Sequence, residues 1–440
     1  MAGAEGRGPG TMMAGMRTLR GACVIAVLLA VVRPAAAQAP SCSATGQSMF
    51  VRDTLQELYL WYRELPEADP ARYASPEQYL EAVRLRPLDA TFSYVTSRAA
   101  NDAFFSESQF IGLGLSTTVS GGEMRVLQVF DGSPAAEAGL ERGARIDVID
   151  GRAVPALIAS GDSASAFGPA QAGLVVTIAF RRRDGERRTA AVRKRAVTIP
   201  TVSLARVFDM GGRKVGYLLF RNFVRPSVAA LDEAFTALRE AGVSELVLDL
   251  RYNGGGLVDV AVHLASLIAG STLRDQVFAE SRHNDRNRRL NATHRFTNPP
   301  QALRLDRLVV IATQSSASAS ELVVNGLRPF MPVVIVGDRT YGKPVGQYAL
   351  PFCDKVFAPV SFAMVNAAGR GDYFGGLAAD CVAADDVEHD LGSADESSLA
   401  EALRFIRSGA CEAPFSVARA LGATLRGPRA TGWAAVVNAQ

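Results

Sequence analysis

Residues 245–256 read ELVLDLRYNGGG, and this stretch decides how the C-terminal half of the chain is interpreted. Its first six residues are mainly apolar, whereas its last three are glycines. A short apolar run that ends at a glycine-rich turn is typical of a buried strand followed by a loop. We therefore expect a strand over 245–250 and a loop with exposed backbone amides over 251–256.

Strand and helix patterns alternate on both sides of this stretch. The expected strands are 215–220, 245–250, 308–313 and 333–336, and the expected helices are 228–241, 257–269 and 321–327. The alternation predicts a multi-domain α/β protein with its core over residues 198–411. In such a core, functional side chains gather in the loops beyond the carboxyl ends of the strands.

The composition is that of an ordinary globular protein. The chain has 440 residues, of which 48% are hydrophobic and 21% are charged, and its length suggests about two or three domains. Its 47 basic residues against 44 acidic ones give a net charge of +3, which provides no electrostatic footprint for nucleic acid. Only four basic residues are lysines, namely Lys194, Lys214, Lys343 and Lys355. A lysine inside a motif therefore suggests a chemical role that arginine cannot perform.

The first 37 residues have the pattern of a secretory signal peptide. Arg17 and Arg20 precede an apolar run over 22–32 and three alanines over 35–37. The run is too short to span a bilayer, which needs about 20 residues. We expect an exported chain, periplasmic or secreted as in bacteria, with no stable membrane span. The residues before Cys42 lack the branched apolar residue of a lipid-anchored cysteine, which argues against such an anchor.

Four cysteines remain once Cys23 is removed with the leader, an even number that suits an oxidising compartment. We predict a local disulfide between Cys353 and Cys381. A second disulfide, between Cys42 and Cys411, is predicted to join the two ends of the folded part. The other two pairings and unpaired thiols remain alternatives. No pair of cysteines has the spacing of a zinc site, so no metal is expected.

Three stretches outside the α/β core differ from it in composition and residue pattern. Residues 38–105 show helical spacing over 50–61 and a helix start at Ser75-Pro76, which predicts a small N-terminal helical domain. Residues 106–197 contain short strands and glycine turns. Residues 412–440 are rich in alanine and arginine without periodicity, which predicts a loosely ordered tail.

The segment 106–197 carries a series of motifs. FIGLGL at 110–115 is followed by SPAAEAGL at 133–140 and GARIDVIDG at 143–151. In this order the motifs resemble a PDZ domain, a small β-barrel-like fold. The backbone amides of the first motif would then hold the terminal carboxylate of a peptide, and the following strand would pair with that peptide. The residues implied are Gly112, Leu113, Gly114 and Leu115.

Three loops that follow expected strands are glycine-rich or polar. They are RYNGGG at 251–256, QSSASASE at 314–321 and GDRTYGKPVGQ at 337–347. The first offers bare amides, the second a serine at a strand-to-helix elbow, and the third a lysine. A serine nucleophile needs a base, and none of the four histidines lies in such a loop. Lysine serves as a base when burial lowers its pKa, whereas arginine does not deprotonate.

Together these loops resemble the motifs of the carboxy-terminal processing (tail-specific) peptidases. These are S41-type serine proteases that use a Ser–Lys dyad and often carry a PDZ domain. The resemblance implies Ser318 as nucleophile, Lys343 as general base and Gln347 as the residue that orients the lysine. Ser318 and Lys343 are 25 residues apart and Gln347 follows four residues later, as in the family. The resemblance also implies a crotonase- or ClpP-like fold for the protease core.

The family's DLRxNxGG motif matches residues 249–256 and implies an oxyanion hole formed by the Ala319 and Gly255 amides. Gly254 stands where the family often has proline, and Pro344 stands where it often has glycine. The oxyanion hole and the lysine loop are therefore the two places where this chain departs from the family pattern.

Several polar residues near these motifs are interpreted as structural. Asp249 and Arg251 are expected to form an ion pair. Ser320, directly before Glu321, is the expected N-cap of the following helix. Asp385, Asp386, Glu388, His389 and Asp390 are interpreted as part of an acidic loop rather than a metal site.

These features predict an exported serine endopeptidase that needs no cofactor. Its partners would be proteins or peptides with apolar C-terminal ends, recognised through the PDZ domain. The alternative is a catalytically inactive PDZ scaffold that only binds peptide C-termini. The joint presence of serine, lysine and glutamine at the family's spacing favours the enzyme.

Overall fold

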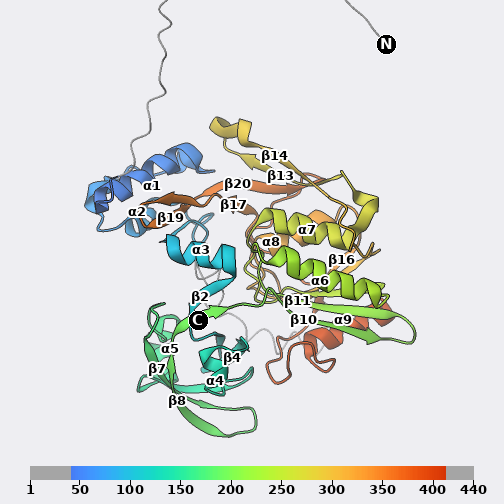
Figure 1. The fold of residues 1–440 in the computed structure, drawn as a ribbon. Coiled ribbons are helices and arrows are strands. Elements are labelled where there is room, and N and C mark those ends of the chain that lie inside the picture. The colour runs from blue at the N-terminus through green and yellow to red at the C-terminus, as the bar shows by residue number, and fades with distance from the viewer. Residues whose placement is uncertain (1–40, 413–440) are drawn as a thin grey trace, which may run out of the picture. The chain divides into compact units, whose positions relative to one another are not determined.

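The computed structural model describes residues 41–412 (Figure 1). The predicted signal peptide over 1–37 and the tail from residue 413 onward lie outside the described residues. In the part of the chain that is described, no helix is both long and apolar enough to cross a bilayer.

A six-stranded sheet forms the centre of the core, as the alternating pattern predicts. Its strands lie in the order β10, β11, β12, β15, β16 and β21, and all neighbours except β10 and β11 are parallel. The strands are β10 (Val202–Asp209), β11 (Lys214–Phe220), β12 (Glu245–Asp249), β15 (Leu308–Ala312), β16 (Val333–Gly337) and β21 (Cys381–Val382). Because β12, β15 and β16 are parallel, the three predicted loops begin at the same edge of the sheet.

Helices cover both faces of this sheet (Figure 1). They are α6 (Ser227–Glu240), α7 (Val258–Ala269) and α8 (Ala319–Leu327) on one face and α9 (Ser397–Ser408) on the other. Side chains of a strand alternate between its two faces. In β11, Leu218 and Phe220 therefore pack under α6 and α7, whereas Tyr217 and Leu219 pack under α9. Each strand and helix expected in the core is present, with ends within two residues of the prediction.

Two smaller antiparallel sheets flank the loop that carries Lys343. One has the strand order β14, β13, β20, β17 and the other has the order β1, β19, β18. Their strands are β14 (Ala292–Arg295), β13 (Val277–His283), β20 (Val360–Asn366), β17 (Val345–Gln347), β1 (Tyr94–Ser97), β19 (Lys355–Ala358) and β18 (Leu350–Phe352). The connections include the 3₁₀ turns η4 (Gly270–Leu273) and η5 (Asp285–Leu290). Since β17 begins two residues after Lys343, pairing of β17 with β20 anchors the lysine loop.

The N-terminal stretch folds mainly into helices, as expected. They are α1 (Ala44–Leu58), α2 (Pro76–Val83) and α3 (Arg98–Glu107), with the 3₁₀ turns η1 (Tyr62–Glu64) and η2 (Pro70–Arg72). α2 begins at Pro76 with the Ser75 side chain as its N-cap, which confirms the predicted helix start. The stretch also contributes β1 to a sheet, and Val51 shares a core with Val345 and Phe357. The N-terminal helices therefore pack directly against strands that flank the lysine loop.

Residues 109–198 form an antiparallel sheet with its own core. The strand order is β3, β4, β5, β7, β8, while β6 pairs with β5 and β2 pairs with β9. The elements are β2 (Gln109–Gly112), β3 (Leu115–Ser120), β4 (Glu123–Val129), α4 (Pro134–Glu137), β5 (Arg145–Ile149), β6 (Arg152–Ala153), α5 (Val154–Ala159), η3 (Ser163–Ser165), β7 (Val175–Arg181), β8 (Arg187–Arg193) and β9 (Arg195–Thr198). β3 lies at the edge of its sheet, so one side of its backbone is not paired within that sheet.

Two disulfides join the cysteines in a different pairing from the predicted one. Cys42 bonds to Cys353, and Cys381 bonds to Cys411, so both predicted pairs are wrong. The reason is spatial: α1 packs against β18, next to the turn that holds Cys353, while β21 lies beside the end of α9. The paired Cα atoms are 5.8 and 5.2 Å apart, within the usual range for a disulfide.

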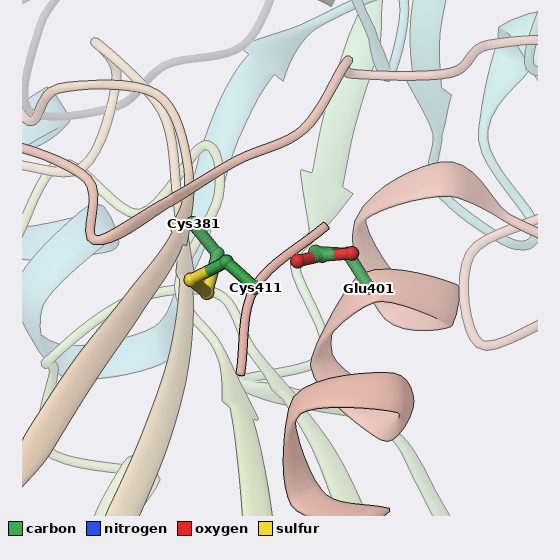
Figure 2. A group of neighbouring side chains, drawn as sticks. All are labelled: Cys381, Glu401 and Cys411. Atoms are coloured by element: carbon green, nitrogen blue, oxygen red, sulfur yellow. A yellow bond between two sulfur atoms is a disulfide. The ribbon is translucent and has the colours of Figure 1, made fainter. Parts of the chain in front are cut away.

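The second disulfide lies beside an acidic residue of α9. Figure 2 shows Cys381 and Cys411 next to Glu401. The two sulfur atoms are bonded to each other, so neither is available as a thiolate ligand for a metal. Glu401 instead pairs with Arg404 at 2.7 Å and accepts a hydrogen bond from the Glu412 amide at 3.0 Å. The cluster therefore fastens the end of α9 to the edge of the sheet.

Peptide mapping without reduction tests the pairing. We expect one linked peptide pair that contains Cys42 and Cys353 and another that contains Cys381 and Cys411. Mass spectrometry before and after reduction, on protein alkylated under denaturing conditions, identifies the pairs. A linked pair that contains Cys353 and Cys381 would contradict the structure.

Candidate active site

Ser318 lies at the elbow between β15 and α8. It directly precedes Ala319, the first helical residue, and its backbone has φ 56° and ψ −112°. A non-glycine residue with such a positive φ is strained, and strain of this kind clusters at functional sites. The expected N-cap, Ser320, is wrong because α8 begins at Ala319 and the Ser320 hydroxyl donates to the Asn253 carbonyl at 2.9 Å. Ser318 therefore lies at the positive end of the α8 dipole.

Lys343 lines the same cavity as Ser318, from the loop between β16 and β17. Burial lowers the pKa of the Lys343 ammonium to about 8, against the opposing effect of the nearby Asp89 and Glu321 carboxylates. Among the ion pairs within residues 41–412, none includes Lys343. The ammonium instead donates to Gln347 Oε1 at 2.5 Å. Because its pKa lies near neutrality, Lys343 is suited to exchange a proton.

The Gln347 side chain has a fixed orientation. Its Nε2 donates to the Phe92 carbonyl at 2.8 Å and to the Ala358 carbonyl at 2.7 Å. Both amide hydrogens are thereby used, so Oε1 is the atom that faces Lys343. This arrangement matches the orienting role that the sequence motif assigns to Gln347.

A cavity of about 140 Å³ joins the three loops. The serine, lysine and glutamine are on its wall, and most of the remaining wall is apolar. The lining residues are Gly254, Gly256, Leu257, Val258, Ser318, Ala319, Leu322, Lys343, Val345, Gly346, Gln347, Phe362, Met364 and Tyr373. The structure therefore brings Ser318, Ala319, Lys343 and Gln347 together around one cavity, as predicted. These residues lie within 29 positions of one another in the sequence.

The glycine loop lies against the serine elbow. A Cβ atom at Gly255, which has φ 95°, would lie 2.8 Å from Ala319 N and 2.8 Å from Ser318 Cβ, so only glycine fits there. The Gly255 amide, however, donates to Asn253 Oδ1 at 2.9 Å. Gly254 and Gly256 line the cavity instead. The amide that the family resemblance assigns to the oxyanion hole thus has an internal acceptor.

Glu321 is a site residue that the sequence reasoning missed. Its buried carboxylate accepts hydrogen bonds from Thr340 Oγ1 at 2.5 Å and from three backbone amides. These amides belong to Ser318 at 2.9 Å, Gly342 at 2.7 Å and Lys343 at 2.8 Å. Burial raises the pKa of Glu321, and the four hydrogen bonds oppose the rise. One carboxylate therefore holds the serine loop and the lysine loop together. The capping-box spacing, three residues after Ser318, was the available signal.

The N-terminal stretch also reaches the site. The Phe92 ring lies 5.9 Å from Lys343 Nζ, and its carbonyl accepts from Gln347. Three residues earlier, the buried Asp89 accepts hydrogen bonds from the Tyr59 and Ser93 hydroxyls at 2.7 and 2.5 Å. Burial raises the pKa of Asp89. No local motif marks Phe92 as a site residue, because its contact with Gln347 spans 255 positions of the chain.

A buried network of ion pairs holds the start of the glycine loop in place. Arg251 pairs with Asp249 at 2.9 Å, which confirms the predicted pair, and also with Glu396 at 2.7 Å. Asp385 accepts a hydrogen bond from the Tyr252 hydroxyl at 2.7 Å. The Asp385 side chain is only 10% exposed and compensates the charges of the buried Arg142 and Arg251.

Arg142, from the sheet of residues 109–198, joins this network. Its guanidinium donates to the Tyr252 hydroxyl at 2.9 Å and pairs with Asp385 at 3.1 Å. Tyr252 has φ 64° and immediately precedes Asn253 and the glycines. The sheet of residues 109–198 is therefore in direct contact with the loop that faces Ser318.

The predicted peptide-binding residues lie between β2 and β3. Leu113 and Leu115 are fully buried in the core of their sheet, so their backbone, and not their side chains, faces any partner. Gly114 has φ 87°, and a Cβ there would lie 2.1 Å from Ser133 Cβ. Gly112 pairs with Arg195 in the β2–β9 ladder. The motif thus forms a tight turn that leads into the edge strand β3.

The clamp formed by Glu321 generates a stability prediction. Replacing Glu321 with Gln keeps its shape but, in either orientation of the amide, turns the NH₂ group toward at least one backbone N–H donor. We expect Glu321→Gln to lower the free energy of unfolding by about 2–5 kcal/mol, measured by urea denaturation. Glu233→Gln, at an exposed position of α6, should change it by less than about 0.5 kcal/mol. Equal small effects for both variants would contradict the clamp.

Comparison with protein families identifies two segments. Residues 214–381 match the model of peptidase family S41, and residues 46–94 match the model of the peptidase S41 N-terminal domain. The C-terminal processing peptidase of the Tetradesmus obliquus chloroplast is 30% identical over 265 residues, which are 55% of this chain and 53% of that protein. The carboxy-terminal processing protease CtpB of Bacillus subtilis is 26% identical over 74% of this chain and 66% of its own length. The chain thus spans about half the length of the Tetradesmus relative.

Solved structures agree with this assignment. An S41 protease structure from Bacteroides fragilis superposes with a TM-score of 0.66 at 26% identity, covering 82% of this chain and 97% of that one. The photosystem II D1 C-terminal processing protease shares the fold, with a TM-score of 0.52 at 22% identity over 79% of this chain and 94% of its own. Residues 214–381 of the α/β core therefore resemble the peptidase domain of family S41, and residues 46–94 resemble the S41 N-terminal domain.

Proposed function

We propose that the chain is a serine endopeptidase that works through a Ser318–Lys343 dyad. The observation that carries the proposal is the shared cavity in which a strained serine faces a lysine whose pKa is about 8. A nucleophilic serine needs a base that is neutral at working pH, and Lys343 meets this requirement. The named relatives are C-terminal processing proteases, which agrees with this reaction class.

The proposed reaction begins with neutral Lys343. Its Nζ accepts the Ser318 proton while Ser318 Oγ bonds to the scissile carbonyl carbon, whose oxygen becomes an oxyanion. Collapse of this intermediate breaks the C–N bond, and Lys343 returns the proton to the leaving amine. A water then attacks the acyl-enzyme with Lys343 again as base, which releases the acid product and restores Ser318. Gln347 keeps the lysine directed at the serine throughout.

The proposed oxyanion hole uses the Ala319 amide, the first of α8, and an amide of the glycine loop. Within residues 41–412, the Ala319 amide donates to no other group, so it is available to a substrate. Each such donor is worth about 2.7–4 kcal/mol of transition-state stabilisation. The Gly255 amide serves as the second donor once its hydrogen bond to Asn253 Oδ1 is broken. The alternative second donor is the amide of Gly256, which lines the cavity.

Substrate recognition is proposed to occur in a PDZ domain over residues 106–197. The edge strand β3 supports this reading, since it leaves a row of backbone groups with which an extended peptide can pair. The turn at residues 112–115 would hold the terminal carboxylate. We expect the last residue of such a peptide to be apolar. The proposed division of the chain is a signal peptide over 1–37, the N-terminal domain over 38–105, the PDZ domain, the protease core over 198–411 and a tail over 412–440.

An exported location is proposed for the mature chain. The signal-peptide pattern predicts export, and the two disulfides are of a kind that persists in an oxidising compartment. The inactive-scaffold alternative explains the edge strand but gives no reason for a lysine with a depressed pKa beside Ser318.

Substitution of the dyad tests the proposal directly. We expect Ser318→Ala, Lys343→Ala and Lys343→Arg each to lower kcat/KM on a loosely folded protein substrate by about 10⁴-fold or more. Arginine keeps the charge but does not deprotonate, so it should not rescue. Lys214→Arg, at an exposed position of β11, is the matched control and should retain activity. Activity of wild-type level in Lys343→Arg would rule out the dyad.

The pKa of Lys343 predicts a pH dependence. Lysine is the base only when neutral, so kcat/KM should rise as pH increases through about 8 and level off above it. Well below the midpoint, each unit of pH should change the rate about tenfold, since the neutral fraction changes tenfold. A rate that is constant between pH 6 and 9 would contradict a lysine base.

The C-terminus of the substrate tests the PDZ proposal. One substrate is prepared in three forms. The first ends in an apolar residue with a free carboxylate, the second ends in aspartate, and the third ends in the same apolar residue with an amide in place of the carboxylate. We expect a lower KM for the apolar, free-carboxylate form, because the loop at 112–115 binds the carboxylate. Equal KM values for all forms would remove tail recognition while leaving the protease in place.

A further inference from the structure

Tyr373 is a buried side chain on the cavity wall that the dyad mechanism does not use. It lies on the connection between β20 and β21, and only 7% of its surface is exposed. It lines the same cavity as Ser318 and packs in the core beneath α7 and α8. The main chain holds it in place, since the Gly376 amide donates to the Tyr373 carbonyl at 2.8 Å.

Within residues 41–412 the Tyr373 hydroxyl makes no hydrogen bond, and it is not one of the fully buried unpaired polar atoms, so it keeps some exposed surface. Three other buried tyrosines of the chain donate to carboxylates. Tyr59 donates to Asp89 at 2.7 Å, Tyr217 to Asp249 at 2.8 Å and Tyr252 to Asp385 at 2.7 Å. A hydroxyl that borders a cavity and has no partner in the protein is available to a polar group that enters the cavity.

The rest of the wall around Ser318 is largely aliphatic and aromatic. Leu257, Val258, Leu322, Phe362 and Met364 supply it. A volume of about 140 Å³ is close to that of an engineered cavity of about 150 Å³ that holds benzene, so a medium-sized side chain fits. The residue whose carbonyl is attacked places its side chain nearest the nucleophile, and this pocket is therefore the one that receives it.

We propose that Tyr373 determines specificity for the residue on the N-terminal side of the scissile bond, and that the pocket selects threonine over valine. The inference rests on the proposed function. Threonine and valine have nearly the same shape, so the apolar wall accepts both. Valine fills the same space but offers no acceptor, so it would enclose the tyrosine hydroxyl without a partner, whereas threonine Oγ1 accepts its hydrogen bond. A site built around a hydrogen bond discriminates strongly against the analogue that lacks it.

Paired peptides test the assignment. Two peptides differ only in threonine or valine before the scissile bond and carry the same apolar C-terminus. kcat/KM is measured for the wild-type chain, for Tyr373→Phe and for Tyr348→Phe, with Ser318→Ala as the blank. Tyr348 is the matched control because it follows Gln347 but does not line the cavity. The residue is 37% exposed, and its hydroxyl is hydrogen-bonded to His283.

The wild-type chain should prefer threonine over valine by about tenfold. In Tyr373→Phe the preference should invert, because a wholly apolar pocket favours the more hydrophobic valine. Tyr348→Phe should keep the wild-type ratio. A second pair, serine and alanine, should show the same preference in the wild-type chain, which tests the inference even if Tyr373→Phe does not fold.

Three outcomes would overturn the inference, and a fourth would overturn the proposed function. A wild-type preference for valine would do so without any variant. A Tyr373→Phe variant that loses activity equally on both peptides would show that the hydroxyl contacts the substrate backbone instead of the side chain. If the wild-type chain cleaves neither of the two peptides and no unfolded protein, the proposed function itself is wrong. If Tyr373→Phe cleaves both peptides with the wild-type ratio of kcat/KM, the specificity inference is wrong but the proposed function stands.

Discussion

Burial of the Lys343 ammonium group without an ion-pair partner is the constraint on which the proposed chemistry depends. Two carboxylates, Asp89 and Glu321, are close enough to raise its pKa, and direct contact with either would hold the lysine charged. Each carboxylate is instead satisfied by hydroxyl and amide donors. The ammonium keeps the neutral oxygen of Gln347 as its acceptor. The site therefore places two negative charges nearby and still leaves the lysine close to its neutral form.

Segments far apart in the sequence maintain this arrangement. Glu321 ties the serine loop to the lysine loop, and the carbonyl of Phe92 fixes Gln347. The glycine loop rests on the Arg251 network, which Arg142 extends into the sheet of residues 109–198. All three folded segments of the chain thus contribute contacts to one site. A change in the packing of the N-terminal stretch or of the 109–198 sheet would reach the cavity through a single layer of side chains.

Much of the core and the dyad was predictable because the signals are local. Short apolar runs and helical patterns alternate along residues 215–336, and Ser318, Lys343 and Gln347 lie within 29 positions of one another. The disulfides were mispredicted because four cysteines allow three pairings and only spatial proximity decides between them. The role of Phe92 was not predictable for the same reason, since its contact with Gln347 spans 255 positions. The free hydroxyl of Tyr373 likewise follows from packing alone.

The scarcity of lysine allows a direct measurement of the central claim. Because the chain has only four lysines, a sample labelled with ¹³C at lysine Cε gives four titratable NMR signals, and Lys343→Arg identifies the one from Lys343. We predict that this signal titrates with a midpoint of about 8. A Lys343 signal that titrates at the ordinary lysine value of about 10.4 would contradict the account, because the proposed base would then be charged at working pH.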